Sequence, residues 1–409
     1  MALREFISTR RGLELFAIPA FAGYWTGRFG GMMAMQMQTL AISWIVYDLT
    51  GDPFALGLIG LVQFAPTLPL ILFAGQVADR VDRRLILMTC QIVQGACAAL
   101  LLVLKVMGGL DLWVLYLVMA LIGSVRAFEM PAGSALLPNL VPTEVRKNAL
   151  ALNSIAGQIA VTLGPATGGL VYALDPEMVF ALAALLNLFA VVRLRLVGPQ
   201  PPMPSGDVKG LRSLLAGFAY IRTRKDILGA ITLDMVAVLL GGVVALLPIY
   251  AKDILMVGPV GLGILRCSPA VGGILMGVWL AGHTIDRRAG PLLFIAVAAF
   301  GVFTLVFALS TNFWLSVVML ALAGAADEVS VVIRQTLVQL TTPDDVRGRV
   351  SSVNSMFIGA SNQLGQFTSG TTAALMGTVP AAAAGAIASI VAVGICAHVF
   401  ERLRRTDRI

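Results

Sequence analysis

Seven ionisable residues interrupt long apolar stretches of this chain. They are Arg28, Arg126, Glu129, Asp234, Asp327, Glu328 and Arg334. A charge near the middle of a bilayer costs about 2.5–3.5 kcal/mol on insertion scales, so such residues face a partner or a water-filled cavity. A carboxylate that gains and loses a cationic partner in such a place can release and take up a proton. The residue types therefore predict proton exchange within a membrane.

The elements that hold these residues are predicted to be membrane helices. Hydrophobic residues make up 58% of the 409 residues, charged residues only 12%, and the mean hydropathy is +0.88. These values lie far from those of soluble domains. A helix needs about 20 apolar residues to cross a bilayer. Twelve stretches are long enough, near 17–47, 54–78, 84–107, 112–138, 148–173, 178–197, 227–252, 258–282, 291–310, 313–340, 349–376 and 379–400. We expect an all-α membrane protein with twelve transmembrane helices.

The second six stretches repeat the first six. Residues that recur 201 positions apart are Pro142 and Pro343, Arg146 and Arg347, Asn153 and Asn354, Gly123 and Gly324, and Gly164 and Gly365. Two similar bundles that rock about a shared site are typical of alternating-access transporters. The pattern predicts pseudo-symmetric six-helix bundles at 1–197 and 226–409. Between them, 198–225 is predicted to be a cytoplasmic linker with an amphipathic helix on the inner membrane face.

The repeat predicts which buried charges meet. Arg126 corresponds to Asp327, and Arg28 corresponds to Asp234 at an offset of 206 residues. We therefore expect Arg28 with Asp234, or Arg126 with Asp327, to attract across a central cavity in one conformation and to separate in another. A released carboxylate would take up a proton.

Two local pairings are alternatives to these long-range pairs. Arg126 and Glu129 share a helix face and can neutralise each other. Asp327 and Glu328 can instead pair statically with Arg334, two turns along the same helix.

Basic residues set the orientation. Of the 29 Lys and Arg residues, 23 are predicted to lie on one side, four lie within predicted helices, and the opposite loops contain only Lys105 and Lys252. Positive loops stay in the cytoplasm, so both termini are predicted to be cytoplasmic. The net charge of +7 then reflects topology and contact with anionic membrane lipids, and no nucleic-acid partner is expected.

Four motifs carry a family resemblance. They are Tyr47-Asp-Leu-Thr-Gly51, Gly75-Gln-Val-Ala-Asp79-Arg80-Val-Asp82-Arg83-Arg84, Phe128-Glu129-Met130-Pro131-Ala132 and Gly164-Pro165-Ala-Thr-Gly168-Gly169. Through them the chain resembles the major facilitator superfamily, and within it the bacterial exporters that include the enterobactin exporter and macrolide efflux pumps. The resemblance implies a transporter of the bacterial inner membrane that works as a monomer.

Two of these motifs predict moving parts. Asp79 can pair with Arg83 or cap a neighbouring helix, and both contacts break when bundles separate. The predicted cytoplasmic gate comprises Gly75, Asp79, Arg80 and Arg83, with a pseudo-symmetric copy at Asp286 and Arg287. Gly164, Pro165, Gly168 and Gly169 resemble the antiporter motif of helix 5, whose small residues permit close helix approach. This favours export over import, with ordinary small-residue packing as the alternative.

One motif departs from the family pattern. Relatives commonly continue the helix 4 motif as Pro-Ala-Arg-Gln, whereas this chain has Gly133-Ser134, and the repeat copy retains Arg334-Gln335. If the helix 4 arginine holds an anionic substrate in relatives, that task is lost here or has moved to Arg126 or Arg334.

A substrate pocket is predicted beside the first helix. Its candidate residues are Tyr24, Trp25, Gln36 and Gln63. The methionines at 32, 33, 35 and 37 would suit varied apolar ligands, because thioether side chains adapt easily. Helix packing and interfacial anchoring of the aromatic rings are the alternative.

The sequence thus predicts proton-coupled export of a medium-sized amphipathic compound, such as a siderophore, a macrolide or another drug. A facilitator or importer on the same fold, and a lipid-handling or sensing membrane protein, are the alternatives. The four cysteines lie in predicted helices without C-x-x-C spacing, so we expect neither a disulfide nor a metal site. The sequence contains no phosphate-binding loop and no catalytic constellation, so we expect neither a cofactor nor an enzyme.

Overall fold

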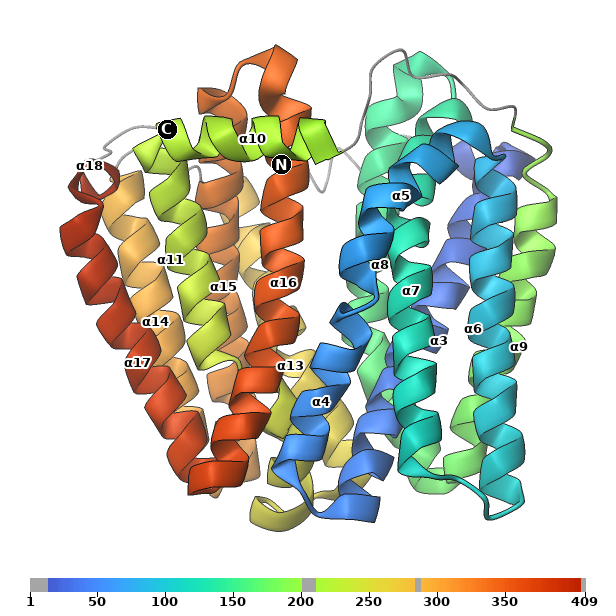
Figure 1. Ribbon diagram of the computed structural model, residues 1–409, viewed down its shortest axis with the longest axis horizontal. Helices are drawn as coiled ribbons and strands as arrows, with labels where there is room; N and C mark the ends of the chain where they lie inside the picture. Colours follow the sequence, from blue (N-terminus) through green and yellow to red (C-terminus); the bar gives the residue numbers. More distant parts are fainter. Residues whose placement is uncertain (1–13, 201–210, 284–287, 406–409) are drawn as a thin grey trace. The chain divides into compact units, whose positions relative to one another are not determined.

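The computed structural model describes residues 14–200, 211–283 and 288–405, and most of them are helical (Figure 1). The helices of the first half are η1 (Leu15–Ala17), α3 (Pro19–Thr50), α4 (Pro53–Phe64), α5 (Thr67–Arg80), α6 (Arg83–Val106), α7 (Leu112–Leu136), η2 (Leu137–Asn139), η3 (Thr143–Val145), α8 (Arg146–Leu174) and α9 (Pro176–Arg195). Those of the second half are α10 (Leu211–Thr223), α11 (Lys225–Gly241), η4 (Val244–Leu246), α12 (Leu247–Ile249), η5 (Tyr250–Ile254), α13 (Gly258–Gly282), α14 (Ala289–Leu309), α15 (Phe313–Thr341), α16 (Asp344–Met376), α17 (Thr378–Val399) and α18 (Glu401–Arg404).

The described residues form two compact units. Unit 1 contains those of Met1–Leu49, Val62–Gly210 and Gly258–Cys267. Unit 2 contains those of Thr50–Leu61, Leu211–Val257 and Ser268–Ile409. Most of α4 therefore packs with unit 2, and the first turns of α13 pack with unit 1.

Ten helical segments among the described residues are long and apolar enough to cross a membrane. The long helices α3 and α16, with 32 and 33 residues, are not among the ten. Both carry many polar side chains and glycines, which lower their hydropathy. The ten segments support a multi-pass membrane protein, and the number twelve stays a prediction.

The structure breaks the predicted helix at 54–78 into α4 and α5, although the candidate membrane span Pro53–Ile71 runs across the break. Pro66 lies at the break and has no N–H to donate to the preceding turn. The Thr67 hydroxyl contacts two backbone oxygens there, the Gln63 carbonyl of its own segment and the Gly123 carbonyl of α7, each at 3.0 Å. The break is therefore fastened to a neighbouring helix of unit 1.

The structure also interrupts the predicted helix at 227–252, which lies within the candidate membrane span Lys225–Ile254. The α-helix α11 ends at Gly241, Gly242 has an extended ψ of 97°, and short 3-10, α and π segments follow. Hydroxyls of α16 take up the freed carbonyls, since Thr368 Oγ1 donates to Leu239 O at 3.0 Å and Ser369 Oγ donates to Gly242 O. A broken membrane helix is tolerated where other protein groups satisfy its backbone.

Duplicated sequence corresponds to duplicated packing. A Cβ added to Gly123 of α7 would lie 1.9 Å from Gln63 O, and one added to Gly324 of α15 would lie 2.0 Å from Pro269 O. The glycines are 201 positions apart and their partners 206. Each unit therefore holds the same close approach of a glycine to the backbone of an adjacent helix.

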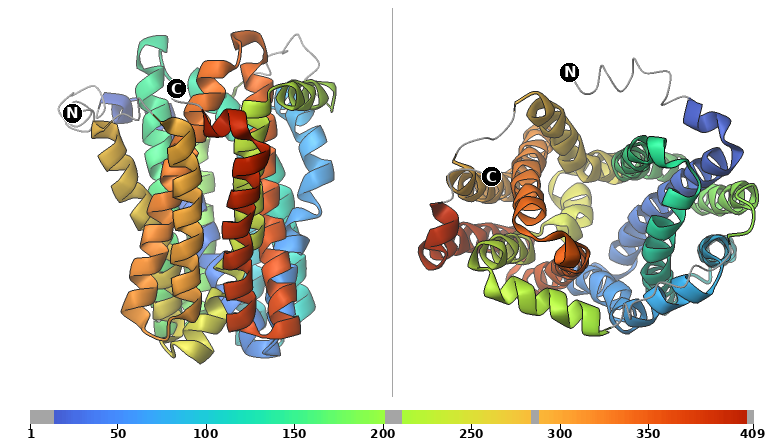
Figure 2. Two further views of the ribbon diagram at one scale, coloured as in Figure 1. Left: turned by 90° about the vertical axis from the view of Figure 1, so that its left-hand side faces the viewer. Right: turned by 90° about the horizontal axis from the view of Figure 1, so that it is seen from above.

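The linker helix α10 lies crosswise at the ends of α11 and α16 in unit 2 (Figures 1 and 2). Ile221 is buried, and a Cβ added to Gly217 would lie 2.8 Å from Arg349 O of α16. The centroids of the Phe218 and Phe357 rings are 6.3 Å apart, and Phe218 as a whole stays exposed. One face of α10 thus packs on the bundle, and its position on the membrane surface stays a prediction.

Candidate functional site

A buried polar cluster surrounds Glu129 in unit 1. Gln94 Nε2 of α6 donates to Glu129 Oε2 at 3.1 Å, and Gln91 Nε2 donates to Oε1 at 3.4 Å. Arg28 Nη1 of α3 lies 3.8 Å from the same Oε1. The carboxylate therefore rests between two neutral amides and one loosely placed cation.

Missing side chains make room for this cluster. A Cβ on Gly31 would lie 2.3 Å from Gln91 Oε1, and one on Gly133 would lie 2.6 Å from Arg28 Nη1. The Tyr24 hydroxyl donates to Gly133 O at 3.0 Å and ties α3 to α7. Arg28 Nε and Nη1 are buried without a hydrogen-bond acceptor in the described structure.

Unit 2 contains a tighter ion pair. Asp234 of α11 pairs with Nη1 of Arg334 of α15, and both side chains are buried. Arg334 is only 2% exposed and is the largest fully buried side chain in the described part of the chain. Removing one partner would leave an uncompensated charge in the interior, which is strongly destabilising.

Asp327 lies beside this pair on the same face of α15 as Arg334. It lines a small cavity with Asp234 and Ser330, together with the apolar residues Ala237, Val238, Val297 and Phe300. No hydrogen bond or ion pair reaches Asp327 from the described residues, although Asp234 and Arg334 act on it electrostatically. Two carboxylates therefore lie near one arginine, which pairs with Asp234.

The remaining intramembrane charges lie apart from this cluster. Glu328 points towards α13, where a Cβ on Gly273 or Gly277 would lie 3.6 Å from its carboxylate. Arg126 is exposed in the middle of α7. The cation that lies within 4 Å of the Glu129 carboxylate is Arg28, and not Arg126. Because Arg334 pairs with Asp234, the structure does not show the alternative static pairing of Arg334 with Asp327 or Glu328. The predicted pairs between the two halves stay predictions.

The predicted gate residues lie at the α5–α6 corner. Asp79 Oδ1 is 4.0 Å from Arg83 Nη2, and the Arg83 guanidinium donates to Ala78 O at 3.2 Å and to Ala135 O of α7 at 3.3 Å. Gly75 and Arg80 lie in the last turns of α5. Asp286 and Arg287, the predicted copy, lie outside the described residues.

Asp82 has a role at this corner that the sequence analysis did not assign. Its Oδ1 accepts the Arg84 N–H and caps α6, and its Oδ2 accepts the Gln200 N–H at 3.0 Å. It therefore fixes the start of the linker to the start of α6.

The helix 5 motif makes close contacts within unit 1. A Cβ added to Gly164 would lie 2.5 Å from Gln36 Cβ, and one added to Gly168 would lie 2.9 Å from Met37 Cα. At Gly169 the distance to Pro259 O of α13 would be 2.4 Å. The space that these glycines leave is occupied by α3 and by the first turn of α13.

The predicted pocket residues are largely engaged in helix contacts. Tyr24 is fully buried, and Trp25 Nε1 donates to Leu152 O of α8 at 3.0 Å and stacks on Phe29. Gln63 is buried, and Gln36 is partly buried against Gly164.

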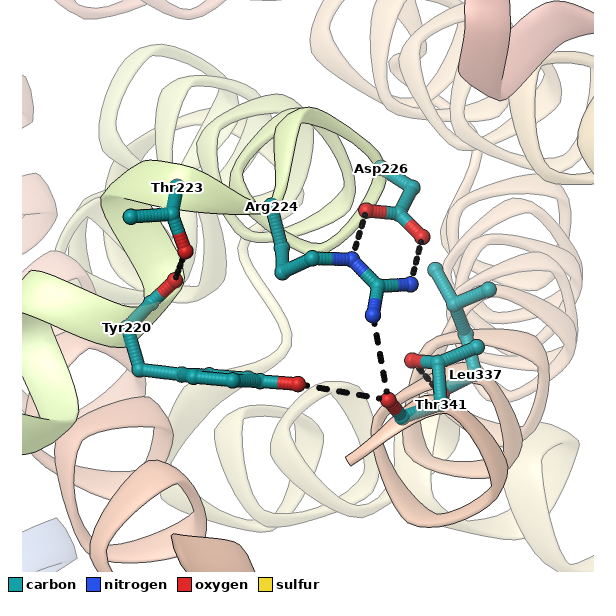
Figure 3. Close-up of polar contacts among 6 residues, drawn as sticks. All are labelled: Tyr220, Thr223, Arg224, Asp226, Leu337 and Thr341. Carbon is teal, nitrogen blue, oxygen red and sulfur yellow. Dashed lines mark hydrogen bonds and ion pairs between the residues drawn. The ribbon is translucent and has the colours of Figure 1, made fainter. Parts of the chain in front are cut away.

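A second polar cluster, absent from the sequence predictions, joins α10 to α15 (Figure 3). Arg224 Nε and Nη2 bind the two oxygens of Asp226 at 3.2 and 2.8 Å. Its Nη1 donates to Thr341 O at 3.4 Å, as does the Tyr220 hydroxyl. The hydrogen-bonded Asp226 carboxylate raises the pKa of Arg224 above its ordinary value. The linker helix is thus fastened to the end of the helix that carries Asp327.

Apolar helices, duplicated packing and buried charges define a membrane transporter. The family model described as transmembrane secretion effector matches residues 12–409. The chain therefore belongs to this family of the major facilitator superfamily, which consists of transporters and not enzymes. The predicted family is confirmed.

Curated relatives are exporters with low identity over most of the chain. The chain is 22% identical to macrolide efflux protein A of Streptococcus pyogenes, over 84% of this chain and 87% of that protein. It is 25% identical to the enterobactin exporter EntS of Shigella boydii, over 95% and 93%. It is 26% identical to the multidrug efflux pump Tap of Mycolicibacterium fortuitum, over 98% of each.

A solved structure shows the same fold. A bacterial homologue of the human lysosomal transporter Spinster, in an inward-facing and unoccupied conformation, aligns with a TM-score of 0.71 at 14% identity, over 98% of each chain. The chain is therefore a multi-pass membrane transporter with a major facilitator fold.

Proposed function

We propose that this protein exports a medium-sized amphipathic compound from bacteria, in exchange for protons, by alternating access. The compound is a siderophore, a macrolide or another drug. The exporter names of the relatives support both the direction and the compound class. The protein lies in the inner membrane with both termini in the cytoplasm and works as a monomer in contact with anionic lipids.

The observation that carries proton coupling is the charge balance around Arg334. With Asp234 and Asp327 both ionised, this cluster has two negative charges and one positive charge. One added proton makes it neutral, and a neutral cluster is far less costly inside a membrane protein. Asp327 is the candidate acceptor, because Asp234 already holds the arginine.

Protonation would change which contacts hold the helices together. When Asp327 is protonated, Asp234 is the only ionised partner of Arg334, and the ion pair between α11 and α15 becomes stronger. When Asp327 loses the proton, its carboxylate again attracts the Arg334 guanidinium and weakens the pair with Asp234. Because α11 breaks at Gly242, two turns beyond Asp234, a change at the ion pair can alter the angle of the segment that follows. The Glu129→Gln variant tests whether Glu129 and Arg28 of unit 1, also predicted as coupling residues, contribute to proton exchange.

Efflux from cells that express the chain tests this proposal. Cells are loaded with ethidium, a macrolide or a catecholate siderophore, and efflux is followed with and without a proton uncoupler. We expect efflux of at least one compound that stops when the uncoupler is added. Uptake driven by the compound's own gradient, without any dependence on pH, would instead identify a facilitator or an importer.

Site variants refine the test. Asp327→Asn removes the proposed acceptor and keeps the shape of the side chain, so uncoupler-sensitive efflux should be lost while compound binding persists. Asp253→Asn, at the outer end of the α11–η5 segment, is a matched control that also removes one carboxylate from unit 2. If Asp327→Asn, Asp234→Asn and Glu129→Gln all retained proton-dependent efflux, the coupling scheme would be wrong.

A further inference from the structure

The cavity beside Asp327 has the size of a single water molecule. It offers about 10 Å³ for the centre of a water-sized molecule, and a bound water requires roughly 10–15 Å³ on this measure. It lies among α11, α14 and α15 within unit 2. Three polar residues, Asp234, Asp327 and Ser330, are part of its lining, and the other lining residues are apolar.

Ser330 supplies an independent sign that the cavity is occupied. Its side chain is 1% exposed, and its Oγ has no hydrogen-bond partner in the described structure. Serine hydroxyls in membrane helices usually bond to their own helix, as Ser316 does on α15, where Oγ donates to Asn312 O at 2.9 Å. A buried hydroxyl without a partner is costly, so one that lines a cavity indicates a bound group.

The number of polar partners fits water. A buried water makes two to four hydrogen bonds, and the residues that line the cavity carry a hydroxyl and two carboxylates. Ser330 follows Asp327 by three positions, which places the hydroxyl and the carboxyl on one face of α15. Asp234 approaches from α11 on the opposite side.

We infer that this cavity binds one water molecule, which passes a proton between Asp327 and Asp234 while Ser330 holds it in place. The inference rests on the proposed proton-coupled function. In the step, Asp327 in its acid form gives its proton to the water, and the water gives one of its own protons to the Asp234 carboxylate. Asp327 becomes the carboxylate, Asp234 becomes the acid, and the water is regenerated. Arg334 then loses its ionised partner on α11 and turns to Asp327 on its own helix.

Infrared difference spectroscopy of the purified full-length protein in lipid vesicles tests the inference without a transported compound. Spectra at acid and neutral pH are compared in D₂O and in D₂¹⁸O with potassium as the salt. We expect a water O–D band that shifts with ¹⁸O. Ser330→Val replaces the hydroxyl with a methyl and adds a second methyl to the cavity, so the band should disappear. Ser316→Ala, the matched control on α15, should keep it.

Three results would overturn the inference. They are the absence of an ¹⁸O-sensitive band in the wild-type protein, an unchanged band in Ser330→Val, and a carboxylate band that responds to sodium in place of potassium at constant pH. The last result would identify a sodium site. Ser330→Ala keeps the cavity and guards against misfolding of the valine variant; its water band should shift in frequency.

A transport readout separates this inference from the proposed function. If ethidium is exported, its uncoupler-sensitive efflux should fall about tenfold in Ser330→Val, the size expected when one hydrogen bond to a charged network is lost. If no compound is exported but the Ser330-dependent water band is present, the proposed function fails and the water site stands.

Discussion

Corresponding positions in the two units carry opposite charges, and the residue on the facing helix differs accordingly. In unit 1, Arg28 on α3 faces Gly133 on α7; in unit 2, the corresponding Asp234 on α11 faces Arg334 on α15. An arginine at position 133 would begin 2.6 Å from the Arg28 guanidinium, so two cations would collide. The comparison gives a physical reason for glycine at position 133 of this chain. The residue at this position follows from the sign of the charge on the facing helix.

The units also differ in how fully their carboxylates are satisfied. Glu129 in unit 1 accepts hydrogen bonds from two buried amides. Asp327 in unit 2 lacks a hydrogen bond from any described residue and shares one arginine with Asp234. Amide donors stabilise the ionised form of an acid. Unit 1 is therefore suited to hold a constant charge, and unit 2 to change its charge.

The largest effect is expected from breaking the pair in unit 2. Arg334→Leu leaves Asp234 buried with no cation of its own and should lower the free energy of unfolding by about 3–5 kcal/mol. The double variant Asp234→Leu/Arg334→Leu should recover most of this loss, because replacing both members of a buried pair is often neutral. Chemical unfolding in detergent measures both. A double variant as unstable as the single one would contradict the assigned pairing.

Transplanting the pair into unit 1 should have the next largest effect. Gly133→Arg adds a large cation beside Arg28, so we expect a loss of about 3 kcal/mol, at the upper end of the range for overpacked interiors. Adding Arg28→Asp should restore part of it by rebuilding the arrangement of unit 2. Thermal unfolding of Gly133→Arg and of the double variant, each against the unmodified protein, gives the comparison. If Arg28→Asp made Gly133→Arg worse, the two units would not share this geometry.

A third prediction compares α8 and α16, the helices that carry Gly168 and Ser369. Ser369 corresponds to Gly168 by the 201-residue offset, but its hydroxyl caps the Gly242 carbonyl at the break in α11. Ser369→Gly should therefore cost about 1–3 kcal/mol by leaving that carbonyl without a donor. Ser352→Gly on the same helix is the control, since its exposed hydroxyl bonds only to its own backbone. Equal losses in the two variants would remove the capping role.

The smallest effect is expected at the linker cluster, which has no counterpart among the described contacts of unit 1. Tyr220→Phe removes one of two hydrogen bonds to Thr341 O and should cost about 1 kcal/mol or less. The Arg224 donor to the same oxygen remains. Hydrogen exchange of α10 measures the loosening. We expect faster exchange in α10 with only a small change in global stability, and unchanged exchange would show that Tyr220 does not fasten the helix.

Much of this site could be predicted from the sequence, because charges in apolar stretches stand out. Asp234, Asp327 and Arg334 were predicted as candidates for that reason alone. Which charges meet could not be predicted, since Asp234 and Arg334 are far apart in the chain and the repeat suggested partners in opposite halves. Gln91 and Gln94 were missed because the candidate coupling residues were chosen only among ionisable residues in the apolar stretches; the i,i+3 spacing of these two amides was the available signal.

The fold, too, could be predicted from the sequence only in part. Helix positions followed from hydropathy, and the family from four motifs. The two helix breaks were missed although Pro66 and the pair Gly241-Gly242 lie at them. Proline and glycine are common in membrane helices and often leave them continuous. Here Thr67, Thr368 and Ser369 satisfy the freed carbonyls from nearby or from another helix, and such long-range hydrogen bonds leave no local pattern.

The central claim is that unit 2 exchanges the coupling proton while unit 1 keeps its charge. The most direct measurement is proton movement across vesicles that contain the purified protein and an exported compound, in Asp327→Asn and Glu129→Gln. We predict that Asp327→Asn abolishes compound-dependent proton movement and that Glu129→Gln reduces it far less. Undiminished proton movement in Asp327→Asn, together with its loss in Glu129→Gln, would contradict the account.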